Sequence, residues 1–160
     1  MLSGKGIKLG VFTLFTLSVF LFYGFLFPKL SISYTSSINA RLMYITGGEF
    51  KKTDIVLFDK TSDVLPKGKA TLAKRVFCLG GDDLKISSKK EFQLLYSIIS
   101  CNDETRKLRV TSYKGLKPFL FEGKIPAAQV FLLGDDDASF DSRYYGFIDS
   151  VKLTKVRKIF

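Results

Sequence analysis

Residues 72–82 read Leu-Ala-Lys-Arg-Val-Phe-Cys-Leu-Gly-Gly-Asp, and this run decides the fold class. Its consecutive apolar residues are typical of a buried β-strand, and the Gly-Gly-Asp that follows indicates a turn. Comparable runs rich in Val, Ile, Phe, Tyr and Leu lie at 54–58, 71–79, 92–99, 108–111, 129–133 and 144–148. No segment beyond residue 30 has the apolar period of a capped helix, although 92–99 is also compatible with a short helix. We therefore expect a mainly β domain.

The N-terminal region carries a second strong signal. Leu9 to Phe27 is a run of 19 residues without a formal charge, preceded by Lys5 and Lys8 and followed by Lys29. As a helix it is about 28 Å long, close to the hydrocarbon thickness of a bilayer. A core helix would carry a polar stripe, and a cleaved signal peptide would have a shorter apolar run followed by small residues. The pattern favours a retained transmembrane anchor.

The charges around this run predict its orientation. The lysines before the apolar run favour a cytoplasmic N-terminus, which leaves the rest of the chain outside the inner membrane. We expect residues 1–30 to form a cytoplasmic stub and anchor, and residues 31–160 to form an extracytoplasmic β-rich domain.

The composition excludes several kinds of chemistry. The 160 residues contain no histidine, so neither a Ser-His-Asp triad nor a His-ligated zinc or haem site is possible. Two cysteines are too few for a Cys₄ metal site. We therefore expect no metal and no cofactor, and any acid–base role belongs to Lys, Asp, Glu, Tyr or water.

The chain is basic, with a formal net charge of +10. Residues 31–160 carry +7, from 22 Lys and Arg against 15 Asp and Glu. Such a domain beside a membrane can rest on anionic headgroups, although a merely soluble Lys-rich surface explains the charge equally well. Nucleic acid is not an expected partner, because the aromatic residues sit inside apolar runs and do not interleave with basic residues.

Two more segments contain groups that can do chemistry. One is Ser33-Tyr-Thr-Ser-Ser-Ile-Asn-Ala-Arg41, just after the anchor, and the other is Gly134-Asp-Asp-Asp-Ala-Ser-Phe-Asp-Ser-Arg-Tyr-Tyr-Gly146. The second is rich in Asp but lacks the Gly and the terminal Glu of an EF-hand loop, so it is not a calcium site. Cys78 and Cys101 are compatible with a disulfide or with two buried thiols.

The anchor, the early serines, the Lys-Arg-Val strand and the late Gly-Asp box occur in the order seen in the serine–lysine (type I) signal peptidases. The chain resembles that family, and its Thr35-x-Ser37 spacing and small size resemble the conjugative-transfer, pilus-processing branch. The late box matches the family pattern at Gly134, Asp135, Ser139, Asp141, Ser142, Arg143 and Gly146. The resemblance implies a signal-peptidase-like antiparallel β domain behind one transmembrane helix.

The resemblance also implies roles for individual residues. Ser37 would be the nucleophile and Lys74 the general base. The Thr35 hydroxyl and the Ser37 N–H would stabilise the oxyanion, and Ser139 would hydrogen-bond the Lys74 amine. Asp141 and Arg143 would form a supporting ion pair, with each other or with Arg75. The substrates would be preproteins whose signal sequences carry small residues at the −1 and −3 positions.

Three positions depart from the family pattern. Asn39 and Ala40 stand where a Pro usually follows the nucleophile, Gly80 replaces the Pro of the turn, and Thr53 replaces a Gly. None of these changes removes a reactive group. Residues 84–124 show no family pattern.

A lysine base has a physical requirement that the sequence can meet. The amine must lower its pKa from about 10.4 towards 7–8, and burial among apolar strand residues such as Val76 and Phe77 does this. The alternative is an inactive membrane-anchored scaffold subunit of a secretion or conjugation apparatus. A self-cleaving repressor is disfavoured, because the anchor lies where its DNA-binding domain would be.

Overall fold

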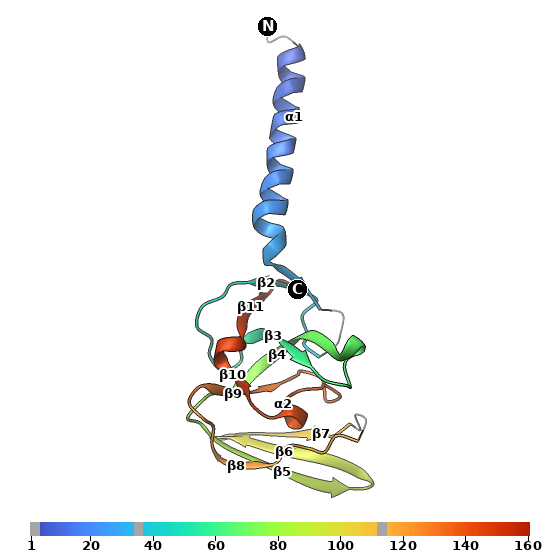
Figure 1. The fold of residues 1–160 in the computed structure, drawn as a ribbon, viewed down its shortest axis with the longest axis vertical. Coiled ribbons are helices and arrows are strands. Elements are labelled where there is room, and N and C mark those ends of the chain that lie inside the picture. Colours follow the sequence, from blue (N-terminus) through green and yellow to red (C-terminus); the bar gives the residue numbers. More distant parts are fainter. Residues whose placement is uncertain (1–3, 34–36, 112–114) are drawn as a thin grey trace.

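The computed structural model describes residues 4–33, 37–111 and 115–160, with side chains from residue 10 onward. The chain begins with a helical rod that projects from a β domain (Figure 1). The rod consists of α1 (Gly4–Leu21), the π-helical η1 (Phe22–Leu26) and the 3₁₀ turn η2 (Phe27–Lys29). Gly10–Lys29 has a mean hydropathy of 2.0 and none of it is buried. Its length and composition suit a membrane span, and its exposure excludes a core helix of this domain.

The larger of two sheets contains seven strands in the order β1-β2-β11-β3-β4-β9-β10, and every pair of neighbouring strands is antiparallel. Its strands are β1 (Leu30–Ile32), β2 (Leu42–Ile45), β3 (Ile55–Thr61), β4 (Lys69–Cys78), β9 (Gln129–Leu133), β10 (Ile148–Asp149) and β11 (Thr154–Lys158). The 3₁₀ turn η3 (Pro66–Gly68) precedes β4, and η4 (Ser150–Lys152) precedes β11. β4 lies between β3 and β9, which places the 72–82 run at the centre of this sheet.

The smaller sheet has four antiparallel strands in the order β7-β6-β5-β8 and lies at the end of the domain far from α1 (Figure 1). Its strands are β5 (Asp83–Glu91), β6 (Leu94–Cys101), β7 (Glu104–Arg109) and β8 (Phe121–Lys124). One buried apolar cluster joins the two sheets, with Phe77, Phe131 and Leu133 from one and Leu84 and Ile99 from the other. A disulfide between Cys78 and Cys101 links β4 to β6 at the same place. The prediction of a mainly β, antiparallel domain is confirmed.

The prediction of a strand at 144–148 is wrong. Ser142–Tyr145 forms the short helix α2, and only Ile148–Asp149 forms a strand. The Asp141 side chain accepts a hydrogen bond from the Arg143 backbone N–H, which caps the helix at its N-terminus. Gly146, with φ of 72°, then ends the helix in a conformation that favours glycine. This local capping overrides the apolar pattern.

The helical alternative for 92–99 is also wrong. Phe92 and Gln93 have φ of 47° and 73° and form the two-residue turn of the β5–β6 hairpin, in which Glu91 pairs with Leu94. Strand β5 has no counterpart among the predicted strands, because its outer half is polar and its residues 87–91 read Ser-Ser-Lys-Lys-Glu. Strand β7 begins at Glu104, earlier than the run at 108–111 suggested.

Candidate active site

Lys74 lies in the middle of strand β4 and is 1% exposed. It is paired in register with Val56 of β3, and its neighbour Val76 is also buried. Arg75, the next residue, places its side chain on the other face of the strand, where it is 31% exposed. The alternation of the strand therefore buries the lysine and leaves the arginine near solvent.

The Lys74 ammonium forms no ion pair with any carboxylate in the described part of the chain. Burial, the largest influence, lowers the pKa of this amine from 10.5 to about 8. The negative charge of Asp141 raises the pKa of Lys74, whereas the positive charge of Arg143 lowers it, as burial does. A buried lysine with this pKa can lose its proton near neutral pH, which a general base requires.

The loop after β9 is built around a buried ion pair. The Arg143 guanidinium donates to both carboxylate oxygens of Asp141, at 2.8 Å from Nε and 2.9 Å from Nη2, and both side chains are fully buried. Arg143 also donates to the backbone carbonyls of Arg109, Asp137 and Ser139, and Asp141 accepts from the Gly134 N–H at 3.0 Å. The expected pairing of Asp141 with Arg143 is present, and these bonds fix the loop that carries Ser139.

Ser139 is 3% exposed and packs against Gly134. A Cβ at position 134 would lie 2.1 Å from the Ser139 Oγ and 2.8 Å from the Ser37 carbonyl oxygen, so only glycine fits there. The Ser139 Oγ has no hydrogen-bond partner among the described residues. The expected hydrogen bond from the Lys74 amine to Ser139 Oγ is therefore not made in this structure.

Ser37 is held beside this loop by the backbone of its own segment. The Asp135 N–H donates to the Ser37 carbonyl at 2.7 Å, and the Asn39 N–H donates to Asp135 Oδ2 at 3.0 Å. Ile38 and Ala40 are buried in the core cluster that also holds Met43. The Ser37 carbonyl is thereby held at the start of the 134–146 loop, beside Gly134.

A salt bridge connects this segment to the Lys74 strand. Arg75 donates to Asp135 from Nε and from Nη2, each at 2.8 Å, and its Nη1 donates to the Thr53 carbonyl. The hydrogen bonding of Arg75 keeps the pKa of Asp135 below its usual value. Asp135 therefore joins three parts of the candidate site, namely the Ser37 segment, strand β4 and the 134–146 loop.

The chain was compared with models of known protein families, and one match extends over nearly its whole length. A family model described as signal peptidase, peptidase S26, matches residues 4–159. The chain belongs to the signal peptidase family. The match leaves open which branch of the signal peptidases it represents. Comparison with curated proteins finds no match.

The signal peptidase family match bears on the candidate site residues described above. Two residues of the predicted nucleophile segment are not among the described residues. Thr35 and Ser36 lie outside the described residues, so the oxyanion role of Thr35 and the choice between Ser36 and Ser37 are not addressed by the geometry. The roles of Ser37, Lys74, Ser139, Asp141 and Arg143 stay hypotheses about a signal peptidase site.

Sequence reasoning gave no role to the Arg75–Asp135 pair. Arg75 and Asp135 lie 60 positions apart in the chain, so no local pattern signals their pairing. Of the two pairings expected for Asp141, the one with Arg143 is present and the one with Arg75 is not, because the Arg75 guanidinium pairs with Asp135.

A groove of about 350 Å³ runs past Lys74. Strand β1 and the following residue contribute Ser31, Ile32 and Ser33 to its wall, and strand β4 contributes residues 70–74. Met43, Leu57, Leu65 and Pro66 complete the lining. The groove is mostly apolar and lies between the segment that leads to Ser37 and the strand that carries Lys74.

A metal site has little support. In the described ranges, the one group of potential metal donors is Cys78, Asp82 and Cys101. Both sulfur atoms are bonded to each other in the disulfide, so neither is available as a thiolate ligand.

Proposed function

We propose that this chain is a membrane-anchored serine endopeptidase that removes signal sequences by means of a Ser37–Lys74 dyad. The observation that carries the proposal is the environment of Lys74. Its side chain is buried in the larger sheet, has no ion-pair partner among the described residues, and has a pKa near 8. The family match supports a serine peptidase in general. The position of the Ser37 carbonyl beside Gly134, against which Ser139 also packs, supports the choice of nucleophile.

In the proposed mechanism, the neutral Lys74 Nζ takes the proton from Ser37 Oγ as this oxygen attacks the carbonyl carbon of the scissile bond. The tetrahedral intermediate collapses when the protonated Lys74 gives that proton to the leaving amine nitrogen. An acyl group is then bonded to Ser37. Lys74 next accepts a proton from a water molecule that attacks the ester, and returns it to Ser37 Oγ as the acid product leaves.

The remaining groups orient these two residues. The developing oxyanion accepts hydrogen bonds from the Ser37 N–H and the Thr35 hydroxyl. Ser139 Oγ is buried and has no hydrogen-bond partner among the described residues. We propose that it accepts a hydrogen bond from the Lys74 amine during catalysis and turns the amine lone pair towards Ser37. The Asp141–Arg143 pair and the Asp135–Arg75 pair keep the loop and the nucleophile segment in place.

The substrate is an extended segment of a signal-bearing preprotein. The groove between β1 and β4 is apolar and passes Lys74, so it suits an extended chain with small residues before the scissile bond. The Thr35-x-Ser37 spacing and the small size favour the conjugative-transfer branch, in which the substrate is a pilin-like proprotein.

Residues 1–30 serve as cytoplasmic stub and anchor, and residues 31–160 lie on the extracytoplasmic side of the inner membrane. Lys5 and Lys8 before the apolar helix support this orientation. The Cys78–Cys101 disulfide supports it independently, because structural disulfides persist in oxidising compartments. Protease added outside spheroplasts should degrade the β domain and leave a tag before Lys5 intact. Protection of the β domain would reverse the orientation.

The experiment that tests the function compares two adjacent serines. We expect Ser37→Ala to abolish cleavage of a signal-bearing substrate in a membrane preparation, with folding and insertion unchanged. Ser36→Ala is the matched control and should keep most of the activity. Loss of activity in Ser36→Ala alone would move the nucleophile by one residue. A wild-type chain that cleaves no signal-bearing substrate would favour the inactive scaffold subunit.

A further inference from the structure

A second groove, of about 650 Å³, lies beside the smaller sheet, which we call the distal sheet because it is far from α1 (Figure 1). This distal groove is lined by residues 93–95 where β6 begins, by residues 109–111 at the end of β7, by residues 116–118 and by Ala138. Most of these side chains are apolar, namely Leu94, Leu95, Val110, Leu116, Pro118 and Ala138. Residues 84–124 show no family pattern, so no role for this groove could be predicted from the sequence.

The distal groove is tied to the loop of the candidate site. The buried Arg143 guanidinium donates from Nη1 to the Arg109 carbonyl, in the wall of the groove, at 2.8 Å. The same guanidinium donates from Nη2 to the Ser139 carbonyl at 2.9 Å. Ala138, which lines the groove, directly precedes Ser139. One buried side chain therefore fixes the position of the groove relative to the candidate site.

The two grooves lie on opposite sides of the candidate site along the long axis of the molecule. The groove that passes Lys74 is lined by β1, which directly follows the helical rod, whereas the distal groove is lined by strands of the distal sheet. Along this axis in Figure 1, α2 lies between β4 and the distal sheet. The apolar part of a signal sequence lies in the bilayer, so the residues before the scissile bond approach from the side of α1. The residues after the scissile bond then continue towards the distal sheet.

The distal groove is positively charged. Arg109 and Lys117 are exposed in its wall, and no acidic side chain occurs among the described residues that line it. Lys90 is opposite Leu95 in the register of β5 and β6, so its side chain lies on the same face of the sheet as this lining residue. Within the described ranges, Lys90, Arg109 and Lys117 form no ion pair. Their charges are therefore available to an acidic ligand.

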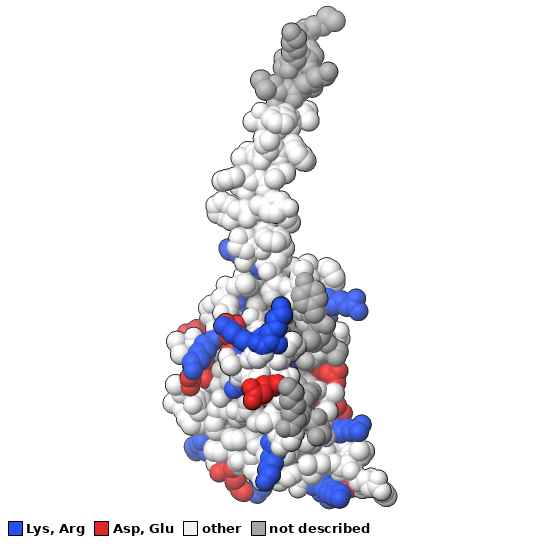
Figure 2. Space-filling model, turned by 45° about the vertical axis from the view of Figure 1, so that its right-hand side comes forward, with Lys and Arg blue, Asp and Glu red and all other residues white. Residues whose placement is uncertain are grey.

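The cations on the outward face of the distal sheet, by contrast, are paired. Lys85 pairs with Glu122, and Lys124 pairs with Asp83. Figure 2 shows acidic side chains beside Lys and Arg at this end of the domain. Unpaired cations are therefore a property of the groove and not of the whole distal sheet.

We propose that the distal groove binds the beginning of the mature protein, on the carboxyl side of the scissile bond, and favours segments that combine acidic with apolar side chains. The inference rests on the proposed peptidase function and adds a second determinant of substrate choice to the small residues before the scissile bond. Arg109 and Lys117 attract carboxylates of the substrate, and the apolar wall accepts its aliphatic side chains. Substrates with lysine in the same segment are repelled.

Cleavage of matched preproteins tests this selectivity. Three preproteins share one signal sequence and differ only in about six residues after the scissile bond, which span about 20 Å as an extended chain. In this segment Leu alternates with Asp in the acidic preprotein, with Asn in the neutral one and with Lys in the basic one. The full chain is reconstituted in phosphatidylcholine vesicles, whose headgroups carry no net charge and do not sort the substrates. The measured quantity is the ratio of kcat/KM for the acidic preprotein to kcat/KM for the basic one.

We expect the wild-type chain to cleave the acidic preprotein about ten-fold more efficiently than the basic one at low salt, with the neutral one between them, and to be less selective at high salt. Arg109→Gln with Lys117→Gln should lower the ratio to about two or less. Arg109→Glu with Lys117→Glu should reverse the preference, a result that a misfolded protein cannot produce.

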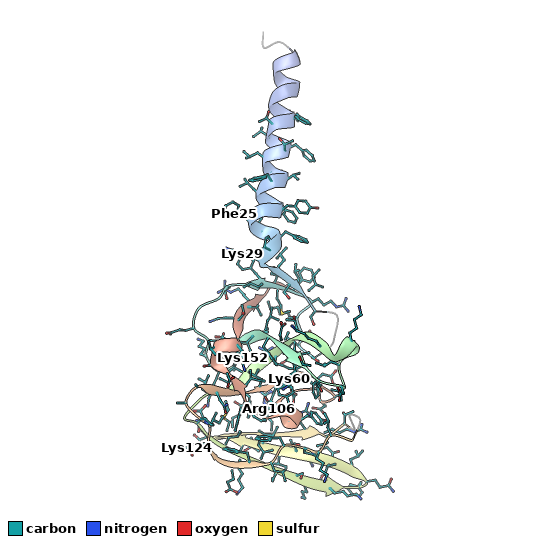
Figure 3. All side chains as sticks on the ribbon, in the orientation of Figure 1. Phe25, Lys29, Lys60, Arg106, Lys124 and Lys152 are labelled. Atoms are coloured by element: carbon teal, nitrogen blue, oxygen red, sulfur yellow. A yellow bond between two sulfur atoms is a disulfide. The ribbon has the colours of Figure 1, made fainter. Side chains whose placement is uncertain are left out.

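Lys85→Gln with Lys124→Gln is the matched control, because it removes the same charge from the outward face and should keep the wild-type ratio. In Figure 3 Lys124 lies at the left of the distal sheet, and it pairs in register with Asp83 at the start of β5, whereas the groove lies where β6 begins. A wild-type ratio near one would overturn the inference. An equal fall of the ratio in the control would also overturn it, by assigning the selectivity to the net charge of the domain. A wild-type chain that cleaves none of the three preproteins would overturn the peptidase function itself, and with it this inference.

Discussion

Two buried cations of the candidate site, Lys74 on strand β4 and Arg143 in helix α2, share their burial but differ in their hydrogen-bond and ion-pair partners. Lys74 is 1% exposed and Arg143 0%. Burial opposes the charge of both, but for Arg143 the hydrogen bonding and charge of Asp141 outweigh it and raise its pKa. For Lys74 burial prevails and the pKa falls to about 8. A buried cation with a complete set of acceptors stays charged and holds structure, whereas one without them can exchange a proton.

The first test of this difference replaces Lys74 by a residue with a permanent charge. Lys74→Arg should lower the rate of signal-sequence cleavage by about 10³-fold or more, as far as Lys74→Ala does, because arginine cannot lose its proton in a protein. The measurement is the turnover rate of a signal-bearing substrate at a saturating substrate concentration. Lys85→Arg, on an exposed lysine paired with Glu122, is the control and should leave turnover unchanged. An active Lys74→Arg enzyme would remove the dyad.

The second test uses the stability of the fold, where the two cations should act with opposite signs. Arg143→Ala leaves the Asp141 carboxylate buried and unpaired, which should cost about 3–5 kcal/mol of unfolding free energy. Lys74→Met removes a charge that burial penalises and should raise stability by up to about 3 kcal/mol at pH 7, the equivalent of the shift from 10.5 to about 8. Thermal unfolding in detergent measures both. Destabilisation by Lys74→Met would indicate hidden acceptors around its amine.

The sign of the pH dependence follows from the same shift. Between about pH 8 and 10.5 the unfolded chain binds more protons at Lys74 than the folded one, so the contribution of Lys74 to stability rises with pH in this window. Below pH 8 both states are protonated and the penalty is fully present. Wild-type unfolding should show this rise relative to Lys74→Met, and parallel curves for the two proteins would contradict it.

The smallest expected effect sharpens the role of Ser139. Ser139→Ala should lower turnover by about 10–100-fold, because the side chain only orients the Lys74 amine. It should also shift the pH at which activity is half-maximal, which a purely structural serine would not do. Ser150→Ala, in the 3₁₀ turn η4 before strand β11, is the control. Full activity with an unchanged pH profile would assign Ser139 to packing against Gly134.

The anchor and strand β4 were easier to predict from the sequence than the conformation of the 134–146 loop. The apolar anchor and the central strand around Lys74 have strong local patterns, so the mainly β fold was accessible from composition and alternation. The burial of Lys74 was not, because a lysine in the middle of a strand usually faces solvent; burial was expected only from the general-base role that the family resemblance implies. The late box matched the family residue by residue, and the Asp141–Arg143 pair followed from it. Its local conformation did not, because the capping of α2 by Asp141 depends on a few hydrogen bonds that an apolar run does not reveal.

The distal sheet was harder to predict for a physical reason. Strand β5 is largely polar and is held by backbone pairing with β6 and β8, and its few apolar residues contact a core contributed by β4 and β9. The Arg75–Asp135 contact likewise joins residues 60 positions apart. Such long-range pairings leave no periodic trace in a single sequence.

The protonation state of Lys74 tests the central claim most directly. In the full chain labelled with ¹⁵N in the lysine side chains, NMR can follow the Lys74 amine through a pH titration, and the signal is assigned by its absence in Lys74→Arg. A midpoint near pH 8, well below those of the exposed lysines, is the predicted result. A midpoint near 10.5, equal to that of an exposed lysine such as Lys85, would contradict the role of Lys74 as general base.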